Sequence, residues 1–280
     1  MKKIIALVLS VIMLACCLTS CGAKTRSLDD IKKSGKLVLY TEAGFAPFEF
    51  ISGGKVVGVD IAICEEIAKE IGVELEVHDV NFDTIIGAIK SGKCDIGAAG
   101  MTITEERKEE VDFSIPYTTS KQYIVCFATD KDDMKLEDLA GKKIGVQLGT
   151  TSDFICSDEV SGTDDDDGNH TKGKLEGTGA EVVTYQNPNL AAVALKENKI
   201  DVVVTDKLPA EMIAANSDGV LKCYELIYAD GSVTDESYGI AMAKGNKELL
   251  DLINDIVNKL IASGKIDEFI VHFSNEVTAD

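Results

Sequence analysis

The chain has 280 residues, of which 45% are hydrophobic, so it is long and apolar enough for one large or two ordinary domains with real cores. Its 48 Asp and Glu residues against 28 Lys and Arg residues give a formal net charge of -20, and such a surface repels phosphate backbones. With no basic aromatic patch and no zinc-type CxxC pair in the sequence, we expect no nucleic-acid partner.

The N-terminus has the layout of a secretory signal. Lys2 and Lys3 precede an uncharged apolar run, from Ile4 to about Leu18, that is short for a membrane-spanning helix. The run ends in LTSCG, which resembles a bacterial lipobox. We therefore expect residues 1–20 to be removed as a signal peptide and Cys21 to carry acyl chains such as palmitate, with residues 21–27 as a tether. An ordinary signal with incidental cysteines is the alternative.

Downstream of this leader, apolar periodicity alternates between strand and helix. In the first half, strands are expected at 36–42, 73–80 and 94–100, and helices at 59–72 and 82–92. Asp60 is the expected N-cap of the first of these helices and Gly72 its end. In the second half, strands are expected at 142–149, 180–186 and 201–206, with helices at 152–157, 189–198 and 208–216. Repeated βαβ units predict an α/β fold with parallel sheets covered on both faces.

The two halves also resemble each other. An offset of 106 residues aligns Ala88, Lys90, Lys93 and Asp95 with Ala194, Lys196, Lys199 and Asp201. This indicates two α/β lobes joined by a hinge of two segments. The expected boundaries are 28–117 plus 238–280 for lobe 1, 122–234 for lobe 2, and 118–121 plus 235–237 for the hinge.

Five cysteines remain beyond Cys21, and their odd number and spacing match no disulfide scaffold or metal knuckle. Cys64 shares a helical face with isoleucines and is expected to be a small buried apolar residue. An acidic segment at 157–179 contains four consecutive aspartates, but it lacks the spaced ligands and turn glycine of a calcium loop. We expect a solvated surface loop there, and no metal or cofactor.

Polar side chains gather at the predicted strand ends of both lobes. Lobes of this kind bind ligands beyond the carboxyl ends of their strands, so four segments should face one cleft: 42–48, 100–107 with Met101, 147–151 and 205–206. Arg107 can clamp a carboxylate through two parallel bonds. Hydroxyls and helix-start N–H groups at Thr102, Thr150 and Thr151 also suit an anion, and Asp206 suits an ammonium. The combination describes an α-amino acid.

Each of these residues has a structural alternative. Arg107 stands among four glutamates and could belong to a solvated helix face. Asp206 could cap the following helix, and Phe45 could be a core residue, as Phe48 and Phe50 are expected to be.

Several stretches resemble the family 3 extracellular solute-binding proteins, which deliver polar amino acids to ABC importers: YTEAGFAPFEF, GVDIAICEEIAKEIG, GMTITEERKEEVDFS, GVQLGTT and YGIAMAKG. The resemblance implies a type II periplasmic-binding-protein fold. It also implies that Arg107 binds the α-carboxylate with Thr102 and Thr150 or Thr151, and that Asp206 and the Gly100 carbonyl receive the ammonium. Phe45 and Phe82 would flank the ligand side chain. The expected partners are a free L-amino acid and permease subunits, for a monomer anchored outside the cytoplasmic membrane.

The sequence also suggests a side-chain preference and a rival class. Glu42 and Gln147 are expected at the far end of the slot, where no basic residue is predicted. This favours arginine or lysine, then glutamine or histidine, and disfavours glutamate or aspartate. The same fold resembles cyclohexadienyl dehydratases, which would need a general acid, with Glu42 and Glu49 as candidates. No histidine falls at a predicted strand end, and we expect a binding protein without catalytic residues.

Overall fold

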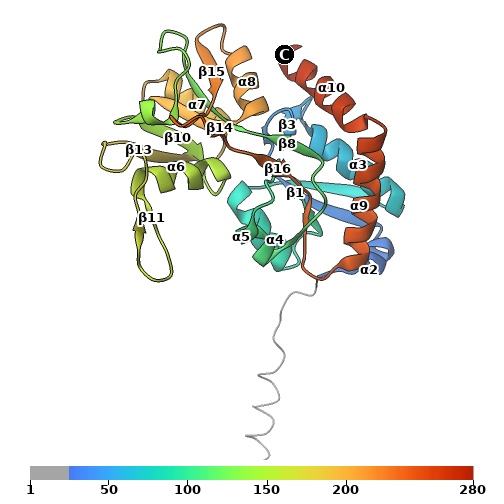
Figure 1. Ribbon diagram of the computed structural model, residues 1–280. Helices are drawn as coiled ribbons and strands as arrows, with labels where there is room; N and C mark the ends of the chain where they lie inside the picture. Colours follow the sequence, from blue (N-terminus) through green and yellow to red (C-terminus); the bar gives the residue numbers. More distant parts are fainter. Residues whose placement is uncertain (1–24, 280) are drawn as a thin grey trace, which may run out of the picture.

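The computed structural model describes residues 25–279. The expected signal peptide and the acylation site Cys21 lie outside the described residues. Two five-stranded sheets divide the chain between two lobes, and the strands β8 (Thr118–Ser120) and β16 (Glu236–Tyr238) lie between these lobes in Figure 1. Among residues 25–279, no helix combines the length and apolar character needed to cross a membrane.

The sheet of the first lobe has the order β5-β1-β6-β17-β7. Its strands are β1 (Lys36–Thr41), β5 (Glu74–Asp79), β6 (Ile96–Gly97), β7 (Asp112–Phe113) and β17 (Ala241–Met242). Its helices are α2 (Leu28–Ser34), α3 (Val59–Ile71), η1 (Phe82–Thr84), α4 (Ile85–Lys90), α5 (Glu105–Glu110), α9 (Lys247–Ala262) and α10 (Lys265–Ala279). A small sheet of β2 (Gly44–Phe45), β3 (Glu49–Ser52) and β4 (Lys55–Val57) adjoins it. This lobe therefore combines both ends of the described chain.

The sheet of the second lobe has the order β13-β10-β14-β9-β15. Its strands are β9 (Gln122–Phe127), β10 (Lys143–Gln147), β13 (Glu181–Tyr185), β14 (Val202–Asp206) and β15 (Leu221–Glu225). Its helices are η2 (Leu136–Leu139), α6 (Thr151–Ser161), α7 (Pro188–Lys196) and α8 (Lys207–Ala215). The α/β class and the two-lobe architecture expected from the sequence are confirmed.

The sheets are mixed rather than wholly parallel, and this corrects the sequence-based expectation. β1 pairs in parallel with β5 and β6, and β10 with β13 and β14. β17 runs antiparallel to β6 and β7, and β9 runs antiparallel to β14 and β15. β9 arrives directly from the first lobe instead of through a crossover helix, so it is free to enter the sheet in the opposite direction.

Both faces of each main sheet are covered. Leu37 and Leu39 of β1 belong to the cluster under α3, α9 and α10, while Val38 packs against the cluster on the opposite face. In β14, Val204 and Val203 likewise point into different clusters. Alternate side chains of a strand point to opposite faces, so these continuous apolar runs indicate two-sided burial.

The start of α3 differs from the prediction. Gly58, not Asp60, occupies the N-cap position, and Asp60 lies inside the helix with 1% of its surface exposed. Its carboxylate accepts hydrogen bonds from the Tyr117 hydroxyl at 2.6 Å and from the Gly100 backbone N–H at 2.8 Å. The carboxylate thus ties α3 to the segment after β6, a long-range role that a local capping pattern does not reveal. The predicted end of the helix at Gly72 is confirmed by its left-handed C-cap conformation.

The acidic segment after α6 forms a hairpin of β11 (Thr163–Asp164) and β12 (His170–Thr171) that projects from the second lobe in Figure 1. Its four aspartates are exposed, as expected for a solvated segment. His170 lies between Asp164 at 2.8 Å and Glu176 at 2.9 Å. All five described cysteines are free, and Cys64 is buried, as predicted, in the hydrophobic cluster under α3, α9 and α10.

Candidate functional site

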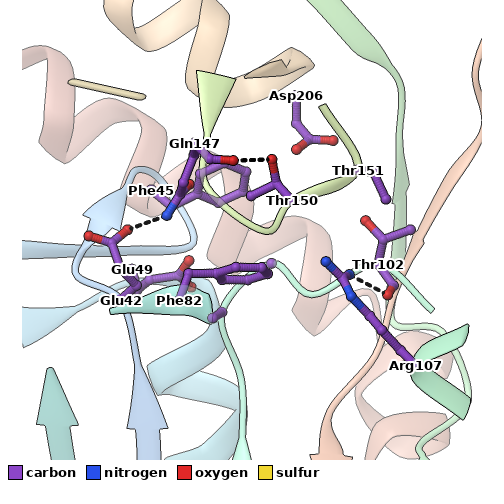
Figure 2. A pocket seen from close by; sticks show the side chains of 12 residues that line it. Glu42, Phe45, Glu49, Phe82, Thr102, Arg107, Gln147, Thr150, Thr151 and Asp206 are labelled. Atoms are coloured by element: carbon purple, nitrogen blue, oxygen red, sulfur yellow. Dashed lines mark hydrogen bonds between the residues drawn. The ribbon is translucent and has the colours of Figure 1, made fainter. Parts of the chain in front are cut away.

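A pocket lies where the carboxyl ends of strands from both lobes meet. It holds about 280 Å³ of empty space, part of which is open to solvent, and it is lined by Glu42, Phe45, Glu49, Phe82, Ala99, Gly100, Thr102, Arg107, Gln147, Thr150, Thr151 and Asp206. Figure 2 shows Glu42 and Glu49 at one end of this pocket and Arg107 at the other.

Ten of the eleven residues predicted for the site line this pocket. Met101 is the exception, because its fully buried side chain packs in a core cluster with Ile85 and Ile89. The sequence places it between two pocket residues, and its side chain turns into the core instead.

Arg107 is buried in the short helix α5, with only 7% of its surface exposed, while Glu105, Glu106, Glu109 and Glu110 are exposed. The alternative of a solvated helix face is therefore wrong. The Arg107 guanidinium donates to the Thr102 carbonyl at 2.7 Å and, across the cleft, to the Gly149 carbonyl at 3.1 Å. It also lies over the Phe82 ring at 5.3 Å.

No carboxylate of the described chain forms an ion pair with Arg107. Burial lowers the pKa of this guanidinium, while Glu236, Asp206 and Glu106 act in the opposite direction. A guanidinium carries five N–H donors and stays charged in proteins, and only two of them are used by the two carbonyls. A buried cation with spare donors is suited to an anionic partner from outside the chain.

The start of α6 lies opposite Arg107. Thr150 is the N-cap: its hydroxyl donates to the Gln147 carbonyl at 2.8 Å and accepts from the Asp153 N–H at 3.4 Å. Thr151 begins the helix, so its N–H has no acceptor within the helix. This first turn adds partial positive charge to the side of the pocket that holds the arginine.

Asp206 ends β14 and stands at the N-cap position of α8, but its side chain makes no capping hydrogen bond. The capping alternative is therefore wrong. The carboxylate instead accepts from Gln122 at 3.0 Å and is 4% exposed. Burial raises the pKa of Asp206 well above its ordinary value, and nearby Glu236 adds to that rise. A cation in the pocket would relieve this unfavourable negative charge.

Glu236 is a site neighbour that the sequence analysis missed. It is 3% exposed in β16, and its carboxylate accepts from Gln122 at 3.1 Å and from the Thr151 hydroxyl at 3.1 Å. Glu236 pairs with Ser120 across the two connecting strands rather than following a strand end, so the strand-end rule does not find it. Its position links the connecting strands to the start of α6.

Glu42 occupies the end of the pocket away from Arg107. Its carboxylate accepts from Gln147 at 3.2 Å and from Asn187 at 3.3 Å, both in the second lobe. Burial raises the pKa of Glu42 to about 7, with a smaller contribution from nearby Asp79. Asn189 of the second lobe also donates to the Gly44 carbonyl at 2.9 Å, so contacts at this end bridge the two lobes. Asn187 and Asn189 were not predicted.

Gly100 and Phe45 shape the middle of the pocket. Gly100 has a φ of +52°, and a Cβ on it would lie 2.6 Å from the Phe45 ring, so glycine is required on both grounds. The Gly100 backbone N–H donates to the Asp60 carboxylate, as described above. Phe45 belongs to the hydrophobic cluster under α3, α9 and α10, as the core alternative held, and its side chain also lines the pocket. Phe48 is fully buried, and Phe50 packs edge-on against Phe273.

Comparison with known proteins places this geometry in context. Residues 37–276 match the family described as bacterial extracellular solute-binding proteins, family 3. The chain is 34% identical over 229 residues to a probable histidine-binding protein of Campylobacter jejuni, covering 82% of this chain and 79% of that protein. It is 30% identical over 253 residues to the arginine-binding extracellular protein ArtP of Bacillus subtilis, covering 90% of each. The crystal structure of the substrate-binding protein AbpA of Streptococcus pneumoniae bound to L-arginine superposes with a TM-score of 0.78 at 30% identity, covering 89% of this chain and 99% of that chain.

Proposed function

Because this chain belongs to the bacterial extracellular solute-binding proteins of family 3, we propose that it captures a free amino acid between its two lobes and delivers it to an ABC permease. The observation that carries the proposal is the buried, charged Arg107, which has spare donors and no carboxylate partner in residues 25–279. Asp206 in the pocket lining and Glu236 beside it are acidic groups close enough to act on Arg107. A zwitterionic ligand satisfies both signs at once.

In the proposed pose the ligand α-carboxylate pairs with Arg107 and faces the first turn of α6. The α-ammonium points to Asp206 and to the carbonyl of Gly100. This orientation places each ligand charge beside its opposite and leaves the ligand side chain directed between Phe45 and Phe82 toward Glu42. The residue roles follow from charge and position in the pocket.

The ligand side chain is proposed to be cationic. Glu42 and Gln147 present oxygen acceptors at the far end, and no basic residue lines the pocket there. Two aromatic rings flank the path, and such rings attract a cation lying over their faces. The names of the relatives above include both arginine and histidine as ligands. Arginine or lysine is therefore ranked first, glutamine or histidine second, and acidic side chains last.

Capture is proposed to involve closure of the two lobes about residues 118–121 and 235–237. The paired strands β8 and β16 connect the lobes there, and the contacts from Arg107 to Gly149 and from Gln147 to Glu42 cross the cleft. Opening would break these cross-lobe bonds, and a ligand bound to both lobes would favour the closed form. The closed form would present one continuous face to a permease.

The proposed location is the outer face of the cytoplasmic membrane, with a lipid on Cys21 and residues 21–27 as the tether. At about 3.5 Å per extended residue, such a tether keeps the body near the membrane. The protein is proposed to act as a monomer there.

Isothermal titration calorimetry on the signal-free protein tests the proposal with arginine, lysine, glutamine and glutamate. Saturable binding of arginine or lysine with one site per chain is expected. Binding of none of the four would contradict it. Turnover of a cyclohexadienyl substrate, with no amino-acid binding, would instead favour the enzyme alternative, in which Glu42 or Glu49 acts as general acid.

A further inference from the structure

Glu49 is a fully buried carboxyl group in the pocket wall, and no donor of the described chain reaches either of its oxygens. Its side-chain contact is with the Asp60 carboxylate, which can accept a hydrogen bond from Glu49 only when Glu49 is protonated. The small sheet sets its position, because Glu49 stands opposite Phe45 in the antiparallel pair of β2 and β3. Side chains directly opposite each other in such a pair lie on the same face. Glu49 therefore lies beside Phe45, toward the end of the pocket that holds Glu42 (Figure 2).

The groups that face Glu49 are acidic or neutral. Asp60 and Cys64 approach from α3, Glu42 from the segment after β1, and Tyr117 from the segment before β8. Asp60 already accepts bonds from Tyr117 and Gly100, so its neighbours offer Glu49 no free donor. No cation among residues 25–279 pairs with any of these three carboxyl groups.

An ionised carboxylate without a hydrogen bond or a cation is strongly disfavoured in such surroundings. Burial, and then the charges of Asp60 and Glu42, raise the pKa of Glu49 well above its ordinary value. In the ligand-free pocket, burial and the neighbouring acidic groups therefore favour the protonated form of Glu49.

We propose that Glu49 is a second acidic group for the ligand side chain and that it releases its proton when a cationic side chain enters the pocket. The step is an ionisation: the O–H bond of the Glu49 carboxyl breaks, the proton passes to water or buffer, and the carboxylate pairs with the arriving cation. A neutral side chain cannot compensate the new charge and leaves the proton in place. Glu49 thereby favours arginine or lysine over glutamine. This inference rests on the proposed function.

Calorimetric titration of arginine near pH 8, in two buffers of different ionisation enthalpy, measures the protons released. At that pH Glu42 is largely ionised already, because its pKa is about 7. The wild type is expected to release about one proton more per arginine than Glu49→Gln, since that proton belongs to Glu49. The α-amino group of the ligand contributes equally to both measurements. Glu65→Gln, an exposed carboxylate on α3, is the matched control and should release as many protons as the wild type.

Equal proton release by the wild type and a folded Glu49→Gln variant would overturn the inference. If that variant does not fold, infrared difference spectra of the wild type decide: arginine should bleach a protonated carboxyl band, and an unchanged band would refute the release. Glutamine or citrulline should leave the band in place. A wild type that binds glutamine but not arginine overturns the proposed ligand class itself, whereas arginine binding without proton release overturns only the role of Glu49.

Discussion

Replacing Arg107 by alanine should weaken ligand binding by orders of magnitude while the protein stays folded. In the proposed pose the guanidinium is the cation for the ligand carboxylate, and it is 93% buried because only 7% of its surface is exposed. Truncating one partner of a buried charge pair costs about 2–5 kcal/mol, since the other charge is left desolvated. At about 1.4 kcal/mol per tenfold, the dissociation constant should rise by about 30-fold to several thousand-fold.

The protein should nevertheless stay folded. Alanine leaves the carbonyls of Thr102 and Gly149 without their donor, at about 1–3 kcal/mol for each buried unsatisfied group. The same change removes a buried charge that has no carboxylate partner within residues 25–279, which offsets part of that loss. A protein with a free energy of unfolding of about 5–15 kcal/mol can stay folded after the net loss that remains.

The assay is calorimetric titration with arginine, together with thermal unfolding followed by circular dichroism. Lys108→Ala is the matched control, because Lys108 is an exposed neighbour on α5 whose ion pair with Glu105 contributes at most about 1 kcal/mol. Arg107→Lys should fall between the two, since lysine cannot form the two parallel bonds. A folded Arg107→Ala variant with wild-type affinity would refute the clamp, and an unfolded one would indicate a structural role.

Three further predictions concern acidity, the ammonium site and the anchor. The ligand-free protein should lose stability as pH rises from about 4.5 to about 7, because the pKa of Glu42 is raised to about 7 in the folded state, which therefore favours the protonated carboxyl group. Urea unfolding should show that the free energy of unfolding falls by an amount on the order of 3 kcal/mol at most. The fall should be absent in Glu42→Gln, and a flat wild-type profile would contradict the prediction. Asp206→Asn should weaken arginine binding at least tenfold without lowering the melting temperature, and unchanged affinity would remove Asp206 from the ammonium site. Mass spectrometry of membrane-extracted protein should find acyl chains on Cys21, and Cys21→Ser should release the protein from membranes. An unmodified N-terminus, or acylation at Cys16, a cysteine within the expected signal peptide that fits the lipobox less well, would show the assignment to be wrong.

Much of the site could be predicted because it depends on a local rule. Strand ends in two α/β lobes converge, so the polar residues at those ends, such as Arg107 and Asp206, were expected in one cleft, and they line one pocket. The two-lobe fold follows from the alternation of strand and helix patterns. Strand direction does not, since the same apolar run fits a parallel or an antiparallel neighbour, and β9 enters antiparallel.

The features of the fold and the site that were not predicted from the sequence depend on tertiary contacts. Asp60 has the sequence context of a cap, but the helix begins at Val59 with Gly58 at the N-cap, and the Asp60 carboxylate accepts from Gly100 and Tyr117 instead. Glu236 and Glu49 are buried acids at the first residues of the short strands β16 and β3, not at the carboxyl ends where the rule looks, and Glu49 was named only as a candidate acid for the enzyme alternative. Charged residues are rarely fully buried, so no local pattern marks an acid that the fold will enclose.

The most direct test of cationic amino-acid capture is a thermal-shift panel of the twenty amino acids on signal-free protein. A ligand at one hundred times its dissociation constant should stabilise the folded state by about 2.7 kcal/mol, which is readily visible as a shift in the melting temperature. The proposed pocket predicts the largest shifts for arginine or lysine, smaller ones for glutamine or histidine, and none for glutamate or aspartate. The largest shift for glutamate, with none for arginine and lysine, would contradict the placement of Glu42 at the end of the ligand side chain.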